Sequence, residues 1–201
     1  MRFAYADPPY PGQARRWYGD HPDYAGEVDH AELIGRLCQD YPDGWALSTG
    51  MVMLQSILAL CPEDVGIAVW YNTTSRPAGA RKWRWFYCWE PVIVRGGRVA
   101  PAVKNVLVAP APSGFLARQW DLPNFPGAKP PAFSRWITSL LGATPDDTID
   151  DLFPGSGAVG RELATIRRQP VLAEVQMTLD GQPAKRARHK VSLPGRSTRG
   201  V

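Results

Sequence analysis

Short apolar runs alternate along the chain with segments whose apolar residues recur at helical spacing, and this pattern predicts strands and helices in turn. Strands are expected over 2–6, 44–49, 65–71, 86–94, 148–153 and 170–175, and helices over 30–40, 51–60, 132–141 and 157–168. Asp29 is placed to cap the helix that starts at residue 30, and Pro91 is expected at an edge or a bulge of the sheet. Because most of these strands are apolar throughout, the pattern predicts a parallel α/β sheet with helices on both faces.

The composition predicts one globular domain with a basic extension. The 201 residues are 44% hydrophobic and 21% charged, which is enough to bury the core of a single domain. We expect that domain to span residues 1–177. Residues 178–201 hold six Lys/Arg and one acid between Gly and Pro, a composition that predicts a disordered tail.

Nothing in the sequence predicts a membrane segment, a signal peptide or a metal site. No apolar run approaches the ~18 residues that a membrane helix needs, and the N-terminus lacks a basic segment followed by an apolar one. The three cysteines are far apart, without a CxxC pair. This pattern favours reduced thiols in a cytoplasmic protein that binds no metal.

Charge is segregated along the chain. Residues 76–98 carry six Lys/Arg against one acid, as the tail does, whereas residues 20–64 carry nine acids against one arginine. A basic segment that also holds Trp83, Trp85 and Trp89 is typical of nucleic-acid binding, in which bases stack on aromatic side chains. Ordinary surface charge and strand packing would explain the same residues.

The sequence Asp7-Pro8-Pro9-Tyr10 directly follows the first predicted strand. In open α/β sheets, ligands bind beyond the carboxyl ends of the strands, so these residues are candidates for a site. An Asp-Pro-Pro sequence also favours a tight turn, which would give it a structural role.

A second motif lies near the end of the predicted domain. Asp151-Leu-Phe-Pro-Gly-Ser-Gly157 reads as a strand, a tight glycine turn and a helix start, where backbone N–H groups can approach a ligand. Glu174 ends the next predicted strand, where an acid can bind ribose hydroxyls or simply face solvent. In a nicotinamide-binding domain the glycine turn comes first. Here most strands precede it, which predicts a circularly permuted sheet.

In this order the motifs resemble the S-adenosylmethionine-dependent DNA amino-methyltransferases of the permuted class, over roughly residues 3–12, 86–95 and 127–176. The resemblance implies a Rossmann-like, circularly permuted α/β fold with a small target-recognition insertion at about 96–126. It implies a catalytic motif made of Asp7, Pro8, Pro9 and Tyr10. The cofactor, S-adenosyl-L-methionine, would contact Ala6, Asp7, Lys129, Asp151, Phe153, Gly155, Ser156, Gly157 and Glu174.

The implied activity is methyl transfer to the exocyclic N6 amine of adenine in DNA. The alternatives are the same reaction on cytosine N4, on single-stranded DNA or on RNA, and a non-catalytic subunit that binds the cofactor or a nucleic acid. The nucleic acid is expected to contact Arg81, Lys82, Arg84 and Trp17. Two departures from the family pattern are the small recognition segment and the lack of a clear strand after Glu174.

Overall fold

The computed structural model describes residues 1–10, 26–75, 86–99, 101–112, 114–120, 128–154 and 160. The chain divides into two compact units, residues 1–168 and residues 169–201, and every described residue belongs to the first. The helix predicted over 157–168, apart from residue 160, and the strand predicted over 170–175 lie outside the described residues, as does the predicted tail.

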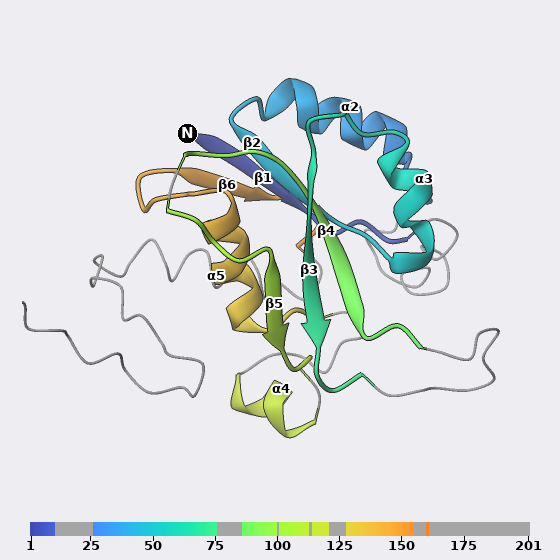
Figure 1. Ribbon diagram of the computed structural model, residues 1–201, viewed down its shortest axis with the longest axis vertical. Coiled ribbons are helices and arrows are strands. Elements are labelled where there is room, and N and C mark those ends of the chain that lie inside the picture. The colour runs from blue at the N-terminus through green and yellow to red at the C-terminus, as the bar shows by residue number, and fades with distance from the viewer. Residues whose placement is uncertain are drawn as a thin grey trace, which may run out of the picture. The chain divides into compact units, whose positions relative to one another are not determined.

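The first unit contains a six-stranded mixed sheet with the strand order β5-β3-β4-β2-β1-β6 (Figure 1). The strands are β1 (Arg2–Ala6), β2 (Gly44–Ser48), β3 (Gly66–Asn72), β4 (Trp89–Gly96), β5 (Val106–Ala109) and β6 (Thr148–Asp151). β1 pairs in parallel with β2 and β6, and β3 in parallel with β5. The expectation of an all-parallel sheet is therefore wrong for one strand, because β4 runs antiparallel to both β2 and β3. The predicted pattern has no helix between β3 and β4, and antiparallel neighbours need no crossover helix.

Pro91 also departs from the expectation, because it lies in β4, between two neighbouring strands, and not in an edge strand. Its carbonyl accepts a hydrogen bond from the Thr49 N–H at 3.2 Å, so the backbone of Pro91 faces the β2 side. Pairing between β2 and β4 ends at Ser48 and Val92. The proline nitrogen has no hydrogen to donate. It faces the β2 side beyond Ser48 and Val92, the last residue pair between β2 and β4.

The helices are α2 (His30–Asp40), α3 (Leu54–Leu58), α4 (Phe115–Gln119) and α5 (Pro131–Leu140). Among the described residues, α2, α3 and α5 lie at predicted positions, whereas α4 was not predicted. The helix predicted over 51–60 divides into a 3₁₀ turn, η1 (Met51–Met53), and α3. Asp29 caps α2 as predicted, because its side chain accepts hydrogen bonds from the N–H groups of Ala31 and Glu32. Among the described residues no helix is long and apolar enough to cross a membrane.

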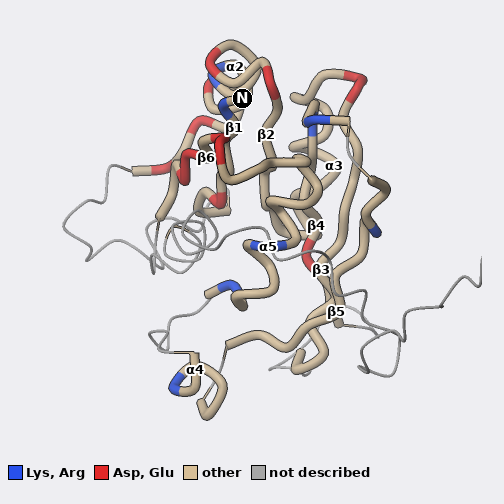
Figure 2. Tube along the Cα trace, turned by 90° about the vertical axis from the view of Figure 1, so that its left-hand side faces the viewer, with Lys and Arg blue, Asp and Glu red and all other residues tan. Residues whose placement is uncertain are grey.

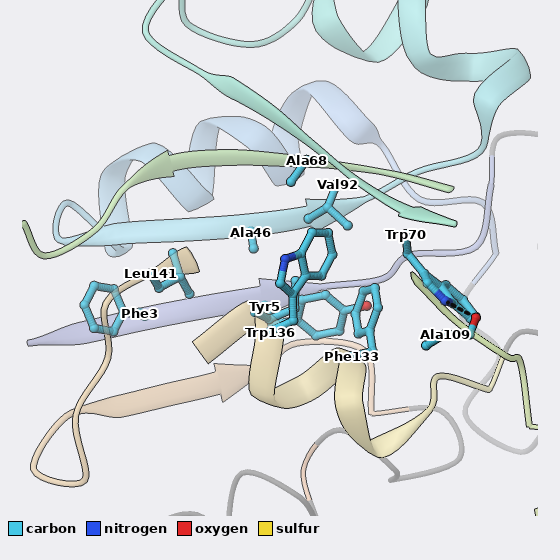
Figure 3. Packing of buried hydrophobic residues seen from close by; sticks show 11 residues of the cluster. Phe3, Tyr5, Ala46, Ala68, Trp70, Val92, Ala109, Phe133, Trp136 and Leu141 are labelled. Carbon is cyan, nitrogen blue, oxygen red and sulfur yellow. Dashed lines mark hydrogen bonds between the residues drawn. The ribbon is translucent and has the colours of Figure 1, made fainter. Parts of the chain in front are cut away.

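Helices cover both faces of the sheet, as expected, and each face has its own hydrophobic cluster. Phe3 and Tyr5 of β1 pack toward α5, whereas Ala4 and Ala6 pack toward α2 and α3. This alternation follows from the two-residue period of a strand. Figure 3 shows the α5 cluster, in which aromatic side chains from the helix and from two strands meet.

Residues 96–126, which were expected to hold a recognition insertion, contain β5 and α4. β5 pairs with β3 at the edge of the sheet, so this part of the segment belongs to the scaffold. A role of the segment in target recognition stays a prediction.

Phe133 is the centre of the α5 cluster, and we expect its truncation to be costly. Its ring is fully buried and makes edge contacts with Tyr5, Trp70 and Trp136 at centroid distances of 5.9, 5.6 and 5.7 Å. Phe133→Ala should lower the free energy of unfolding in urea by about 3–5 kcal/mol. Phe115→Ala removes the same ring from a residue that is 72% exposed, and it should change that free energy by less than about 0.5 kcal/mol. Equal losses would show that Phe133 is not a core residue.

Candidate active site

The two-residue period of β1 places Asp7 at the carboxyl edge of the sheet on the α5 face. Asp7 is in phase with Phe3 and Tyr5, which pack toward α5. Its neighbour Pro8 is buried and Pro9 is half-buried, so the two rings restrict the backbone that carries the carboxylate. The structure thus brings Asp7 to the edge where ligands bind in open α/β sheets.

Lys129 lies immediately before α5 and places its ammonium group between two carboxylates. Its side chain is 4% exposed, and Nζ lies 3.1 Å from Asp7 Oδ2 and 2.9 Å from Glu90 Oε2. The same nitrogen is 5.7 Å from the ring centroids of Trp70 and Phe133, within range of a cation–π attraction. A buried ammonium is tolerated only where anions compensate for its lost hydration, and here two do so.

The neighbouring charges affect the protonation of Lys129 and Asp7. Burial alone lowers the pKa of Lys129, but the fields of Asp7 and Glu90 outweigh it and raise that pKa well above its ordinary value. Burial raises the pKa of Asp7, and Glu90 raises it further, while Lys129 opposes both. Lys129 therefore remains a cation at neutral pH, and its charge favours the ionised form of Asp7.

Glu90 reaches this edge because β4 runs antiparallel to its neighbours. The first residues of β4 lie level with the last residues of β3, with Glu90 opposite Trp70. Glu90 was not among the site residues predicted from the sequence. The available signal was an acid inside the otherwise apolar segment Trp89–Gly96, but its significance depends on the direction of the strand.

Tyr10 joins the same group of side chains. Its hydroxyl donates a hydrogen bond to Glu90 Oε2 at 3.4 Å. Burial is the largest cause that raises the pKa of Tyr10, and the phenol is therefore neutral at physiological pH. We call this group the edge cluster; its members are Asp7, Tyr10, Glu90 and Lys129.

A second polar contact lies nearby, at the ends of β1 and β2. It is a buried hydrogen bond of 2.9 Å between the Tyr5 hydroxyl and Ser48 Oγ.

Asp151 ends β6, the strand next to β1, and pairs with Tyr5 in the sheet. Its Oδ1 accepts a hydrogen bond from the Phe153 N–H at 3.4 Å. Oδ2 is buried and makes no hydrogen bond of good geometry among the described residues, although the nearby backbone of Gly160 lowers the pKa of the carboxyl. Burial raises the pKa of Asp151 to about 6, and the charge of Asp7 contributes to the shift. A buried acceptor of this kind is costly unless a donor binds to it.

The other predicted site residues are not part of the edge cluster or are not described. Ala6 and Phe153 belong to the hydrophobic cluster under α2 and α3. The following predicted contacts lie outside the described residues: Trp17, Arg81, Lys82, Arg84, Gly155, Ser156, Gly157 and Glu174.

Charged residues are unevenly distributed over the described part of the chain. Figure 2 shows most Asp and Glu positions gathered around α2, β1 and β6. Two arginines of the basic segment 76–98 are held in ion pairs, Arg95 with Asp64 at 2.8 Å and Arg98 with Asp147 at 2.8 Å. These two already have carboxylate partners within the chain, and the prediction of phosphate contacts rests on the other basic residues of that segment.

Comparison with known proteins supports the fold. No protein-family model matches the sequence, and no curated protein sequence matches it. Among solved structures, the chain is similar to the crystal structure of the M1.HpyAVI–SAM complex, with a TM-score of 0.53 and 15% sequence identity. The match covers 83% of this chain and 78% of that chain. At this identity the match shows a shared fold, a mixed α/β sheet of the Rossmann-like methyltransferase type.

Lys129→Met tests whether the edge cluster depends on its buried cation. The substitution keeps a similar shape but leaves two partly buried carboxylates facing each other, so stability at pH 7 should fall by about 3–5 kcal/mol. The loss should shrink as the pH is lowered toward 4, because protonation removes the repulsion. Arg36→Met is the matched control, since Arg36 meets Asp40 at 3.9 Å on the surface. It should cost less than about 0.5 kcal/mol in the same urea titrations. A pH-independent loss for Lys129→Met would contradict the electrostatic account.

Asp151→Asn should stabilise the protein in a pH-dependent way. The pKa of Asp151 is about 6 in the folded chain and 3.8 ordinarily. The folded state therefore holds more protons than the unfolded state between these values, and wild-type stability falls as the pH rises through that window. Asparagine cannot ionise, so the melting temperature of the variant should exceed that of wild type at pH 7 and approach it near pH 4. Parallel melting curves across this range would show that the carboxylate is not strained by burial.

Proposed function

We propose that this chain is an S-adenosylmethionine-dependent methyltransferase that acts on the exocyclic N6 amine of adenine in DNA. The observation that carries the proposal is the edge cluster, in which Lys129 holds the carboxylate of Asp7 at the carboxyl edge of a methyltransferase-type sheet. Two further facts support it. The motif Asp7-Pro-Pro-Tyr10 resembles that of DNA amino-methyltransferases, and the fold is similar to that of M1.HpyAVI, a protein crystallised with S-adenosylmethionine.

The residues at the edge fit the proposed cofactor. The methionine part of S-adenosylmethionine carries an ammonium group, and the buried Oδ2 of Asp151 is an acceptor in need of a donor. Gly155, Ser156 and Gly157 follow Asp151 in sequence and would line the same moiety, and Glu174 would accept hydrogen bonds from the ribose. Lys129 and the backbone of Ala6 and Asp7 would complete the contacts. When bound, the cofactor supplies a methyl group activated by its sulfonium.

Asp7 addresses the main difficulty of the reaction. The lone pair of an exocyclic amine is delocalised into the base, so the amine is a poor nucleophile. A carboxylate that accepts one N–H bond, together with a carbonyl such as that of Pro8 accepting the other, favours a tetrahedral nitrogen. Lys129 binds Asp7 through Oδ2, and Oδ1 can accept from the amine.

Positioning supplies most of the remaining rate enhancement. Holding an amine in line with an activated methyl group contributes on the order of 7–11 kcal/mol. Asp7 need not be a strong base, because the methylated ammonium is acidic and releases its proton readily. Tyr10 would stack on the target base after the base has been extruded from the DNA duplex, as base-modifying enzymes require. Trp17, Arg81, Lys82 and Arg84 are the proposed contacts to the nucleic acid.

Nucleoside mass spectrometry tests the activity and the substrate together. Purified protein with S-adenosylmethionine is incubated with unmethylated genomic DNA, with the same DNA heat-denatured, and with RNA, and each product is digested to nucleosides. N6-methyladenine in the duplex or denatured DNA supports the proposal. N4-methylcytosine, or methylation of RNA alone, would replace the proposed substrate. Binding of S-adenosylmethionine without any methylated product would favour a non-catalytic subunit.

Asp7→Ala should lower the rate of methyl transfer by at least about 100-fold, because a positioned polar catalytic group is lost. Affinity for S-adenosylmethionine, measured by calorimetry, should change far less, since Asp151 and the glycine turn remain. Asp64→Ala is the control: its carboxylate is 62% exposed and meets only Arg95 among the ion pairs of the described residues. It should retain wild-type activity. An active Asp7→Ala enzyme would show that the Asp-Pro-Pro-Tyr motif is a structural turn.

A further inference from the structure

The ring of Tyr10 lies directly against Gly50. A Cβ atom built on Gly50 would lie 3.0 Å from both Cδ2 and Cε2 of Tyr10, tighter than most Cβ contacts, so the ring would have to move by a few tenths of an ångström. The backbone of Gly50, with φ −79° and ψ 144°, is extended and suits any residue. The local conformation therefore does not require glycine here. Glycine is favoured because the Tyr10 ring occupies the space that a side chain would need.

Gly50 is held in place from both sides. The preceding residue, Thr49, donates its N–H to the carbonyl of Pro91 at 3.2 Å, which ties this segment to β4. The carbonyl of Gly50 accepts from the N–H of Met53 at 2.9 Å and so begins the turn that leads into α3. Because sheet and helix both restrain this backbone, an added methyl group would displace the tyrosine ring and not the main chain.

Tyr10 has a second anchor at the other end of its side chain. Its hydroxyl donates to Glu90 Oε2, and the same oxygen accepts from Lys129 Nζ. Glu90 therefore links the ring position to the cation that holds Asp7. The contact at the ring and the hydrogen bond at the hydroxyl together restrain the position and the orientation of the ring relative to Asp7.

We infer that Gly50 is a positioning residue for the acceptor base. Because Gly50 has no side chain, the Tyr10 ring can lie against its backbone, where the ring can stack on a base held beside Asp7; we call this contact surface the seat. The inference rests on the proposed function, and it assigns a role in base placement to a residue outside the Asp-Pro-Pro-Tyr motif. A Cβ at position 50 would push the ring off this seat and shift the base relative to the carboxylate. A shift of about 1 Å can cost 100-fold in rate when a reaction depends on alignment, so a displacement of a few tenths of an ångström is expected to cost less than that.

A double-mutant cycle between positions 50 and 10 tests the seat. Gly50→Ala alone should lower kcat/KM for unmethylated genomic DNA by about 3- to 10-fold, while the Kd for S-adenosylmethionine stays within about twofold. In a Tyr10→Ala background no ring is present to be displaced, so adding Gly50→Ala should have no further effect. Gly35→Ala is the matched control, because a Cβ there meets nothing within 4 Å. It should leave kcat/KM unchanged.

Two results would overturn the inference. One is wild-type kcat/KM in Gly50→Ala, and the other is the same loss from Gly50→Ala with and without the Tyr10 ring. The cycle is also run on urea unfolding, which needs no activity. Non-additive unfolding free energies support the contact between the two residues, and additive ones overturn it. If wild type transfers no methyl group although the unfolding cycle is non-additive, the proposed function has failed and with it the role of the seat in base placement.

Discussion

A buried ammonium at the edge of a sheet requires anions beside it, and the site is organised around this constraint. Lys129 Nζ lies within 3.1 Å of carboxylates from the end of β1 and the start of β4. These strands are separated by β2 in the sheet. The ion contacts therefore tie three distant parts of the chain to one point. Removing the cation would leave two partly buried negative charges unpaired, and this is costlier than never having buried them.

The fold makes this arrangement possible by combining parallel and antiparallel pairing. Parallel strands bring Asp7, Ser48 and Asp151 to one edge, because their carboxyl ends coincide. An antiparallel strand brings its beginning to that edge, so β4 adds Glu90 and no further carboxyl-end residue. Helix α5 starts on the same side and supplies Lys129 directly before its first turn.

Stability and the proposed activity make opposite demands on the edge residues. The side chain of Asp151 leaves one buried oxygen without a hydrogen bond of good geometry among the described residues, and burial raises its pKa to about 6. The clustered aromatic rings beneath, with Phe133 at their centre, provide the compensating stability. The polar groups and the apolar support thus lie on the same face of the sheet, because Asp7 follows Phe3 and Tyr5 at the two-residue period of β1 and Asp151 pairs with Tyr5.

Local patterns in the sequence determined where most strands and helices lie, the cap at Asp29 and the position of Asp7 at the end of β1, because periodicity and capping depend on residues near in sequence. They did not predict β5 or α4. The sequence motifs pointed to Tyr10 and Asp151, and the family resemblance pointed to Lys129. The direction of β4 was decided only by the tertiary structure, because an apolar run records burial but not orientation. The roles of Glu90 and Gly50 depend on that direction and on a contact between residues forty positions apart. The residues next to Glu90 and Gly50 in the sequence do not indicate which distant side chains these two contact.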